Sequence, residues 1–136
     1  MSDSSARVPT DDLVAAAREA RERAYAPYSD FTVGAAVLAG GRIYSGANVE
    51  NASYGLSICA ERVAATTAVA AGERTIEAVV VVGSATKPTP PCGACRQFLS
   101  EFGPEMLVVV QTPDGERETW RMSEVLPHAF GPAFLE

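Results

Sequence analysis

The sequence predicts an α/β fold in which helices cover a mixed five-stranded sheet. The predicted elements follow the order helix, strand, strand, helix, strand, helix, strand, strand. The two-residue turn Gly40-Gly41 indicates an antiparallel hairpin, whereas the later strand–helix–strand units imply parallel neighbours. The chain has 136 residues, of which 47% are hydrophobic, and this length suits one domain. We therefore expect a single domain over residues 1–136, with residues 1–9 forming a flexible N-terminal segment.

The first helix is predicted over residues 10–25. Thr10 belongs to the residue types that cap helices, and Asp11 and Asp12 suit the positive end of the helix dipole. Pro27 follows the predicted end of the helix, because proline cannot continue the helical hydrogen bonds.

The next segment has the period-two pattern of a strand, because apolar residues alternate with their neighbours at Phe31, Val33, Ala35 and Val37. The return strand is predicted over residues 42–49, directly after the Gly40-Gly41 turn. A loop rich in Asn, Ser and Gly follows over residues 50–57.

A helix–strand pair is predicted in the middle of the chain. The helix covers residues 59–71, and Gly72 stops it. Residues 77–83 contain four consecutive valines, which favour a buried strand over a piece of buried helix. Residues 84–91 form a loop with three prolines.

The last elements complete the sheet. A helix is predicted over residues 92–102, and strands follow over residues 106–111 and 117–121, separated by the turn Pro113-Asp114-Gly115. Ser123 is a candidate cap for a final short helix.

Charge and composition exclude several classes of partner. The formal net charge is −6, whereas nucleic-acid binding needs a basic face. The apolar runs are too short to span a membrane, and residues 1–10 lack the apolar core of a signal peptide. An odd number of cysteines without a secretion signal predicts a reducing, cytoplasmic setting. We therefore expect no nucleic-acid partner and no membrane contact.

All three cysteines fall in two short motifs, Cys59-Ala60-Glu61 and Cys92-Gly93-Ala94-Cys95. Three protein ligands hold a tetrahedral zinc and leave the fourth position open for water. Cys92 and Cys95 share one face of a helix, and both motifs open predicted helices, whose N-termini favour thiolates. The pattern predicts one Zn²⁺ per chain, with Glu61 moving protons for the water.

Other interpretations of these motifs stay open at this point. Cys92 and Cys95 alone suit a thiol-redox pair, but that leaves Cys59 and Glu61 unexplained. A structural zinc module usually has four ligands, and no fourth cysteine or nearby histidine exists. Arg62 is either a hydrogen-bond donor to the thiolates or a surface arginine, and Arg96 has a weaker claim to the same role. The lone histidine, His128, is expected to be solvated or to serve packing.

From Tyr25 to Phe130 the chain resembles the small, homotetrameric type of zinc-dependent cytidine deaminase. The resemblance rests on six motifs in the right order: Tyr25-Ala26-Pro27-Tyr28-Ser29, Phe31-Thr32-Val33-Gly34-Ala35-Ala36, Asn48-Val49-Glu50-Asn51-Ala52-Ser53-Tyr54-Gly55, Cys59-Ala60-Glu61-Arg62, Pro91-Cys92-Gly93-Ala94-Cys95-Arg96-Gln97 and Leu126-Pro127-His128-Ala129-Phe130. The sequence departs from the family pattern at His128, where a smaller residue is common.

The resemblance implies a role for each of several residues. Cys59, Cys92 and Cys95 match the zinc ligands, and Glu61 matches the proton shuttle. Arg62 matches an arginine that neutralises thiolate charge. Asn48 and Glu50 match residues that hold the ribose hydroxyls. Phe31 matches an aromatic residue that packs on the nucleoside, and the backbone of Ala60 matches a group that contacts the pyrimidine ring. Two more, Tyr54 and Phe130, match positions that reach a neighbouring subunit's site.

The implied fold is a three-layer α/β/α sandwich with a five-stranded mixed sheet. The implied activity is hydrolytic deamination of free cytidine and deoxycytidine in pyrimidine salvage, by a homotetramer with shared active sites. Deamination of a nucleoside antibiotic such as blasticidin is the close alternative, although Glu50 after Asn48-Val49 favours a plain ribose. A non-catalytic zinc-binding module is the third hypothesis.

Overall fold

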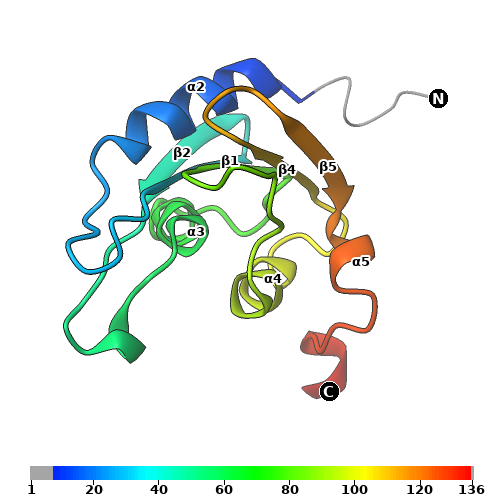
Figure 1. Ribbon diagram of the computed structural model, residues 1–136. Coiled ribbons are helices and arrows are strands. Elements are labelled where there is room, and N and C mark those ends of the chain that lie inside the picture. Colours follow the sequence, from blue (N-terminus) through cyan, green and yellow to red (C-terminus); the bar gives the residue numbers. More distant parts are fainter. Residues whose placement is uncertain (1–7, 136) are drawn as a thin grey trace.

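A five-stranded sheet with the strand order β2-β1-β3-β4-β5 forms the middle layer of the protein (Figure 1). The structure is a computed structural model and describes residues 8–135. Its strands are β1 (Val33–Ala39), β2 (Arg42–Ala47), β3 (Ala78–Gly83), β4 (Leu107–Gln111) and β5 (Arg117–Arg121). The β3–β4 pair is parallel and the other neighbouring pairs are antiparallel. The predicted mixed sheet is therefore confirmed.

Helices cover both faces of this sheet, as Figure 1 shows. The helices are α2 (Thr10–Arg21), α3 (Ala60–Ala70), α4 (Gly93–Ser100) and α5 (Met122–Val125), with 3₁₀ turns η1 (Tyr54–Leu56) and η2 (Pro132–Leu135). The helix α2 lies on one face, and α3 and α4 lie on the other. This arrangement is the expected three-layer sandwich. Among the described residues, no helix is long and apolar enough to cross a bilayer.

The strand β1 is buried on both faces, so that its residues divide between two core clusters. Ala35 and Val37 join the cluster beneath α3 and α4, while Ala36 and Leu38 join the cluster beneath α2. At Gly34, a Cβ atom would stand 1.9 Å from the Ala17 carbonyl oxygen of α2. Only glycine therefore allows α2 to lie this close to the sheet.

The predicted first helix was too long at its C-terminal end. The helix α2 ends at Arg21, and Tyr25 instead forms a bridge with Val49. The Tyr25 amide donates to the Asn48 carbonyl oxygen at 3.0 Å, and the Glu50 amide donates to the Tyr25 carbonyl oxygen at 2.8 Å. These non-local hydrogen bonds satisfy backbone groups that a longer helix would use internally.

Other helix and strand boundaries also differ from the predicted ones. The strand β1 begins at Val33 rather than Phe31, and β2 ends at Ala47, because Val49 bridges to Tyr25 and Ile58. Neither predicted cap holds: Pro9 precedes α2, with Thr10 already inside it, and Arg121 precedes α5. Residues 1–7 of the expected flexible segment lie outside the described residues, and Val8 packs against the cluster beneath α2.

Candidate metal centre and active site

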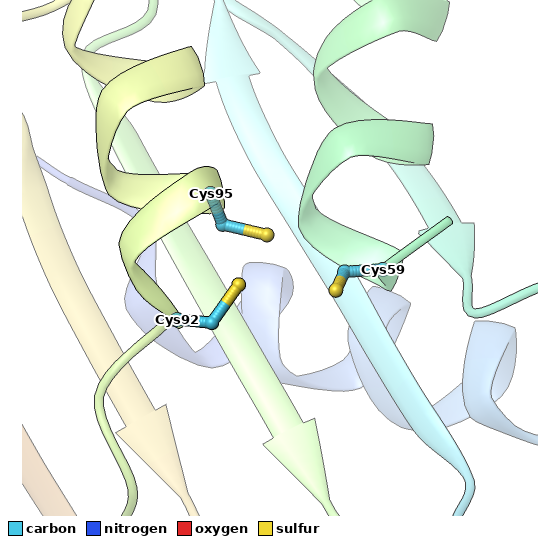
Figure 2. A group of neighbouring side chains, drawn as sticks. All are labelled: Cys59, Cys92 and Cys95. Atoms are coloured by element: carbon cyan, nitrogen blue, oxygen red, sulfur yellow. The ribbon is translucent and has the colours of Figure 1, made fainter. Parts of the chain in front are cut away.

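The three cysteines converge because they lie at the starts of two neighbouring helices. Cys59 directly precedes α3, Cys92 directly precedes α4, and Cys95 lies in the first turn of α4. Figure 2 shows the three sulfur atoms directed toward a common point, and they lie within 4.8 Å of one another. Sulfurs bonded at about 2.3 Å to a tetrahedral zinc stand about 3.8 Å apart. The cysteine set therefore fits a single zinc ion.

The electrostatic surroundings favour a thiolate at Cys59. A hydrogen bond from the Cys95 thiol, helped by Arg62, lowers the pKa of Cys59 to about 5 even though burial opposes the shift. The same hydrogen bond, together with burial, raises the pKa of Cys95. The N-termini of α3 and α4 add positive potential at this point. The site therefore favours the anionic sulfur that a metal requires.

Arg62 lies against the thiol cluster and is not a free surface arginine. Its Nη2 donates to the Cys59 sulfur at 3.7 Å, while its Nε is buried with no hydrogen-bond partner among the described residues. Arg96 has a different role, since it donates to the carbonyl oxygens of Pro91 at 2.7 Å and Val125 at 2.9 Å. Of the two arginines, only Arg62 therefore has a hydrogen bond to a thiol sulfur.

Glu61 is a buried carboxyl group in the first turn of α3, with only 6% of its surface exposed. Burial is the main reason that its pKa rises to about 7. Among the described residues, the cysteine group contains no carboxylate, so Glu61 is separate from the ligand set. A carboxyl group with this pKa both accepts and returns a proton near neutral pH.

A cavity of about 410 Å³ opens beside the cysteines and Glu61. Four of the residues predicted to bind substrate line it: Phe31, Asn48, Glu50 and Ala60. Other residues that line the cavity were not predicted from the sequence, including Ser29, Lys87 and Gln111. Ser29 belongs to a recognised motif, so a signal existed there, whereas Lys87 lies in the three-proline loop and carries none.

Glu50 holds the segment that precedes β1. Its Oε1 accepts hydrogen bonds from the amides of Tyr28 at 3.0 Å and Ser29 at 3.2 Å, and its Oε2 accepts one from the Ser29 hydroxyl. The hydrogen bond from Ser29 is the main cause that lowers the pKa of Glu50. Glu50 is therefore an ionised acceptor that still has lone pairs for a ligand hydroxyl.

Asn48 is almost fully buried and holds the start of β1. Its Oδ1 accepts from the Val33 amide at 2.9 Å, and its Nδ2 donates to the Phe31 carbonyl oxygen at 2.9 Å. Each group of the amide keeps one further hydrogen-bonding position. Asn48 therefore orders the backbone beneath Phe31 and also faces the cavity.

Two predicted substrate residues do not line this cavity. Tyr54 is 76% exposed and packs edge-on against Tyr28, with ring centroids 6.2 Å apart. Phe130 is 56% exposed and stacks on Phe134, and its carbonyl oxygen accepts from Gln97 at 2.8 Å. Both aromatic rings project from the surface of this single chain.

The positions of the three sulfur atoms disfavour the redox-pair and structural-zinc interpretations of the cysteine motifs. A redox pair of Cys92 and Cys95 leaves Cys59 out, although its sulfur lies in the same cluster. Among residues 8–135, the cluster has three ligands rather than the four of a closed structural site. His128 is exposed, as expected for a solvated residue. The cluster therefore has the composition of an open metal site.

The chain is similar to known deaminases over most of its length. A sequence profile of the cytidine and deoxycytidylate deaminase zinc-binding region matches residues 9–111. The cytidine deaminase of Halalkalibacterium halodurans is 48% identical over 120 residues, which cover 87% of this chain and 91% of the relative. The cytidine deaminase of Sporosarcina psychrophila is 45% identical over 122 residues, which cover 88% of this chain and 90% of the relative.

Solved structures agree with this similarity. The crystal structure of cytidine deaminase from Burkholderia pseudomallei has a TM-score of 0.87 and 47% sequence identity. The match covers 90% of this chain and 100% of that chain. The cytidine deaminase from Mycobacterium tuberculosis has a TM-score of 0.79 and 38% identity, covering 91% of this chain and 98% of that one.

Proposed function

Since the chain belongs to the family defined by the cytidine and deoxycytidylate deaminase zinc-binding region, we propose that it hydrolytically deaminates free cytidine and deoxycytidine. The products are uridine or deoxyuridine and ammonia, and the reaction consumes one water. One observation supports this proposal above the others. The buried Glu61 carboxyl group and two of the three clustered cysteines, Cys59 and Cys92, line one cavity that is also lined by Phe31 and ionised Glu50.

Cys59, Cys92 and Cys95 are the proposed ligands of one zinc ion per chain. The donor set fits zinc, because three thiolates and an open position match a catalytic rather than a closed site. When bound there, zinc supplies a Lewis acid that lowers the pKa of water. Negative charge on the thiolates weakens zinc as a Lewis acid. The Arg62 guanidinium withdraws part of this charge from the Cys59 sulfur.

Glu61 is the proposed proton carrier. In the hydrolysis, its carboxylate takes a proton from the attacking water and gives it to the ring nitrogen beside the reacting carbon. It then takes the second proton from the added oxygen and delivers it to the departing amino group, which leaves as ammonia. Burial of Glu61 keeps bulk water from competing for these protons.

The nucleoside is proposed to bind across the mouth of the cavity. Glu50 accepts hydrogen bonds from ribose hydroxyls, and Asn48 uses the positions on its amide that the backbone leaves free. Phe31 packs its half-exposed ring against the nucleoside, and the Ala60 backbone contacts the pyrimidine ring. Glu50 disfavours an added phosphate, because like charges repel.

We also propose that the chain forms a homotetramer with shared active sites. Tyr54 and Phe130 expose most of their rings and match positions that reach into a neighbour's site in the resembling family. Burying exposed aromatic surface against a second copy stabilises such an assembly. A cytoplasmic role in pyrimidine salvage is consistent with a free nucleoside substrate.

Two measurements on the purified protein test the proposed function. Zinc per chain is measured by atomic spectroscopy, and the loss of cytidine absorbance in the ultraviolet is followed in the same preparation. We expect one zinc per chain and conversion of cytidine to uridine. A preparation with full zinc and no turnover of cytidine or deoxycytidine, but turnover of a cytosine nucleoside antibiotic, would replace the proposed substrate with the alternative one.

A further inference from the structure

Phe31 follows a turn whose backbone is held by several hydrogen bonds. Asp30 adopts a left-handed backbone with φ of 60°, and its amide donates to the Ala26 carbonyl oxygen at 3.0 Å. The Phe31 amide donates to the Ser29 hydroxyl at 3.0 Å, and the Phe31 carbonyl oxygen accepts from Asn48. The backbone on both sides of the ring is therefore held by residues that line the cavity.

The next residue, Thr32, is held from a different part of the chain. Its amide donates to the Ser84 hydroxyl oxygen at 3.0 Å, and the Ser84 hydroxyl donates to the Thr32 carbonyl oxygen at 2.8 Å. The two side-chain hydroxyl oxygens are also 3.1 Å apart. One serine side chain therefore satisfies both backbone polar groups of Thr32, across 52 positions of sequence.

Arg21, the last residue of α2, completes this arrangement. Its Nε donates to the Thr32 carbonyl oxygen at 3.2 Å and to the Thr32 hydroxyl at 3.1 Å, and its Nη2 donates to the Ser84 hydroxyl at 3.2 Å. A planar guanidinium binds several acceptors in a defined geometry. The helix α2 lies on the opposite face of the sheet from α3 and α4 (Figure 1). These hydrogen bonds therefore link its last residue to Thr32 and Ser84, whose chain neighbours line the cavity.

The group Arg21, Thr32 and Ser84, here called the Ser84 clamp, joins two walls of the cavity. On one wall, Phe31 precedes Thr32; on the other, Ser84 lies between the lining residues Gly83 and Ala85. A Cβ atom placed on Gly83 would stand 4.0 Å from the Phe31 ring, so the ring lies beside the end of β3. Moving Ser84 relative to Thr32 therefore changes the distance between the walls.

We propose that the Ser84 clamp positions Phe31 against the wall that contains Gly83 and Ala85 and thereby determines the affinity for the nucleoside. This inference rests on the proposed function. The hydrogen bonds of Arg21, Thr32 and Ser84 reach neither the cysteines nor Glu61. The three residues are therefore positioning residues and act on binding rather than on proton transfer. Preorganisation of a binding wall lowers the cost of ordering it when the ligand arrives.

The main test compares Ser84→Ala with Ser100→Ala. Ser100 is a matched control, because its buried hydroxyl donates to the Gln97 carbonyl oxygen at 3.0 Å near the C-terminal end of α4, away from the cavity. We expect Ser84→Ala to raise KM for cytidine about tenfold, with kcat and zinc content close to the starting protein. Ser100→Ala should leave KM unchanged. An unchanged KM in Ser84→Ala, or an equal rise in Ser100→Ala, overturns the proposal.

A second pair of variants separates the hydroxyl from simple packing. Thr32→Val removes the hydroxyl that accepts from Arg21 and keeps the side-chain shape, whereas Thr32→Ser keeps the hydroxyl. We expect KM to rise in Thr32→Val and to return toward its original value in Thr32→Ser. A larger rise in Thr32→Ser than in Thr32→Val would show that shape, not the hydrogen bond, is responsible.

Hydrogen exchange tests the clamp without using activity. The Thr32 amide should exchange faster in Ser84→Ala, while the Val33 amide, which donates to Asn48, should change less. Unchanged exchange at Thr32 overturns the clamp whether or not the protein deaminates cytidine. If the starting protein fails to deaminate cytidine but Thr32 exchange responds as expected, the proposed function and the effect on nucleoside affinity are overturned, whereas the hydrogen bonds of the clamp are supported.

Discussion

Replacing Glu61 with glutamine tests the separation between metal binding and proton transfer. The change keeps the shape of the side chain and removes only its titrating group, and Glu61 is not part of the cysteine cluster. A positioned acid–base group contributes about 10²–10⁴-fold to a rate. In the proposed mechanism Glu61 serves two proton transfers, and water has little access to a side chain that is 6% exposed. We therefore expect kcat to fall by about 10⁴, which corresponds to about 5.5 kcal/mol in the barrier.

The assay measures three quantities on Glu61→Gln: the rate of cytidine absorbance loss, zinc per chain, and binding of uridine. Zinc and uridine binding should persist, because the ligands and the cavity walls remain. Cys59→Ala is the contrasting variant and should lose zinc and thermal stability together, since metal binding is coupled to folding. Glu118→Gln, an exposed glutamate on β5, is the control for the chemical change. The reasoning is refuted if Glu61→Gln turns over normally, or if it loses zinc as readily as Cys59→Ala.

The remaining predictions concern substrate, assembly and backbone. Cytosine in an oligonucleotide, or cytidine monophosphate, should react far more slowly than cytidine because of the net charge of −6 and because Glu50 lines the cavity at the proposed ribose site; comparable kcat/KM values for an oligonucleotide would contradict this. Truncation before Leu126 should reduce activity more than zinc content, and a fully active monomer in sedimentation would oppose shared sites. Gly34→Ala should lower the free energy of unfolding by about 1–3 kcal/mol, since its Cβ would stand 1.9 Å from the Ala17 oxygen; denaturant unfolding checks this. Asp30→Val should cost about 1–2 kcal/mol because of the φ of 60°, while Asp30→Gly should cost less in the same assay.

Local patterns in the sequence were sufficient for the elements and for the core of the metal site. The alternation before Gly40-Gly41 and the four valines of β3 predicted strands, because side-chain shape and period act on nearby backbone. The i, i+3 spacing of Cys92 and Cys95 at a predicted helix start indicated that the two thiols lie together, and they do so although Cys92 is the extended residue that precedes α4. The cysteine cluster was therefore predictable once both helices were expected to start together.

Only the tertiary structure decided how the cavity wall that contains Phe31 is built. Tyr25 leaves the expected helix because the Asn48 carbonyl oxygen and the Glu50 amide pair with its backbone, and Asn48 directs its side-chain amide to Phe31 and Val33. No local pattern pairs Ser84 with Thr32, because hydrogen bonds between residues 52 positions apart form only after the sheet brings β1 and β3 together. Polar side chains in loops have many possible partners in the unfolded chain, and packing of the surrounding helices and strands selects one of them.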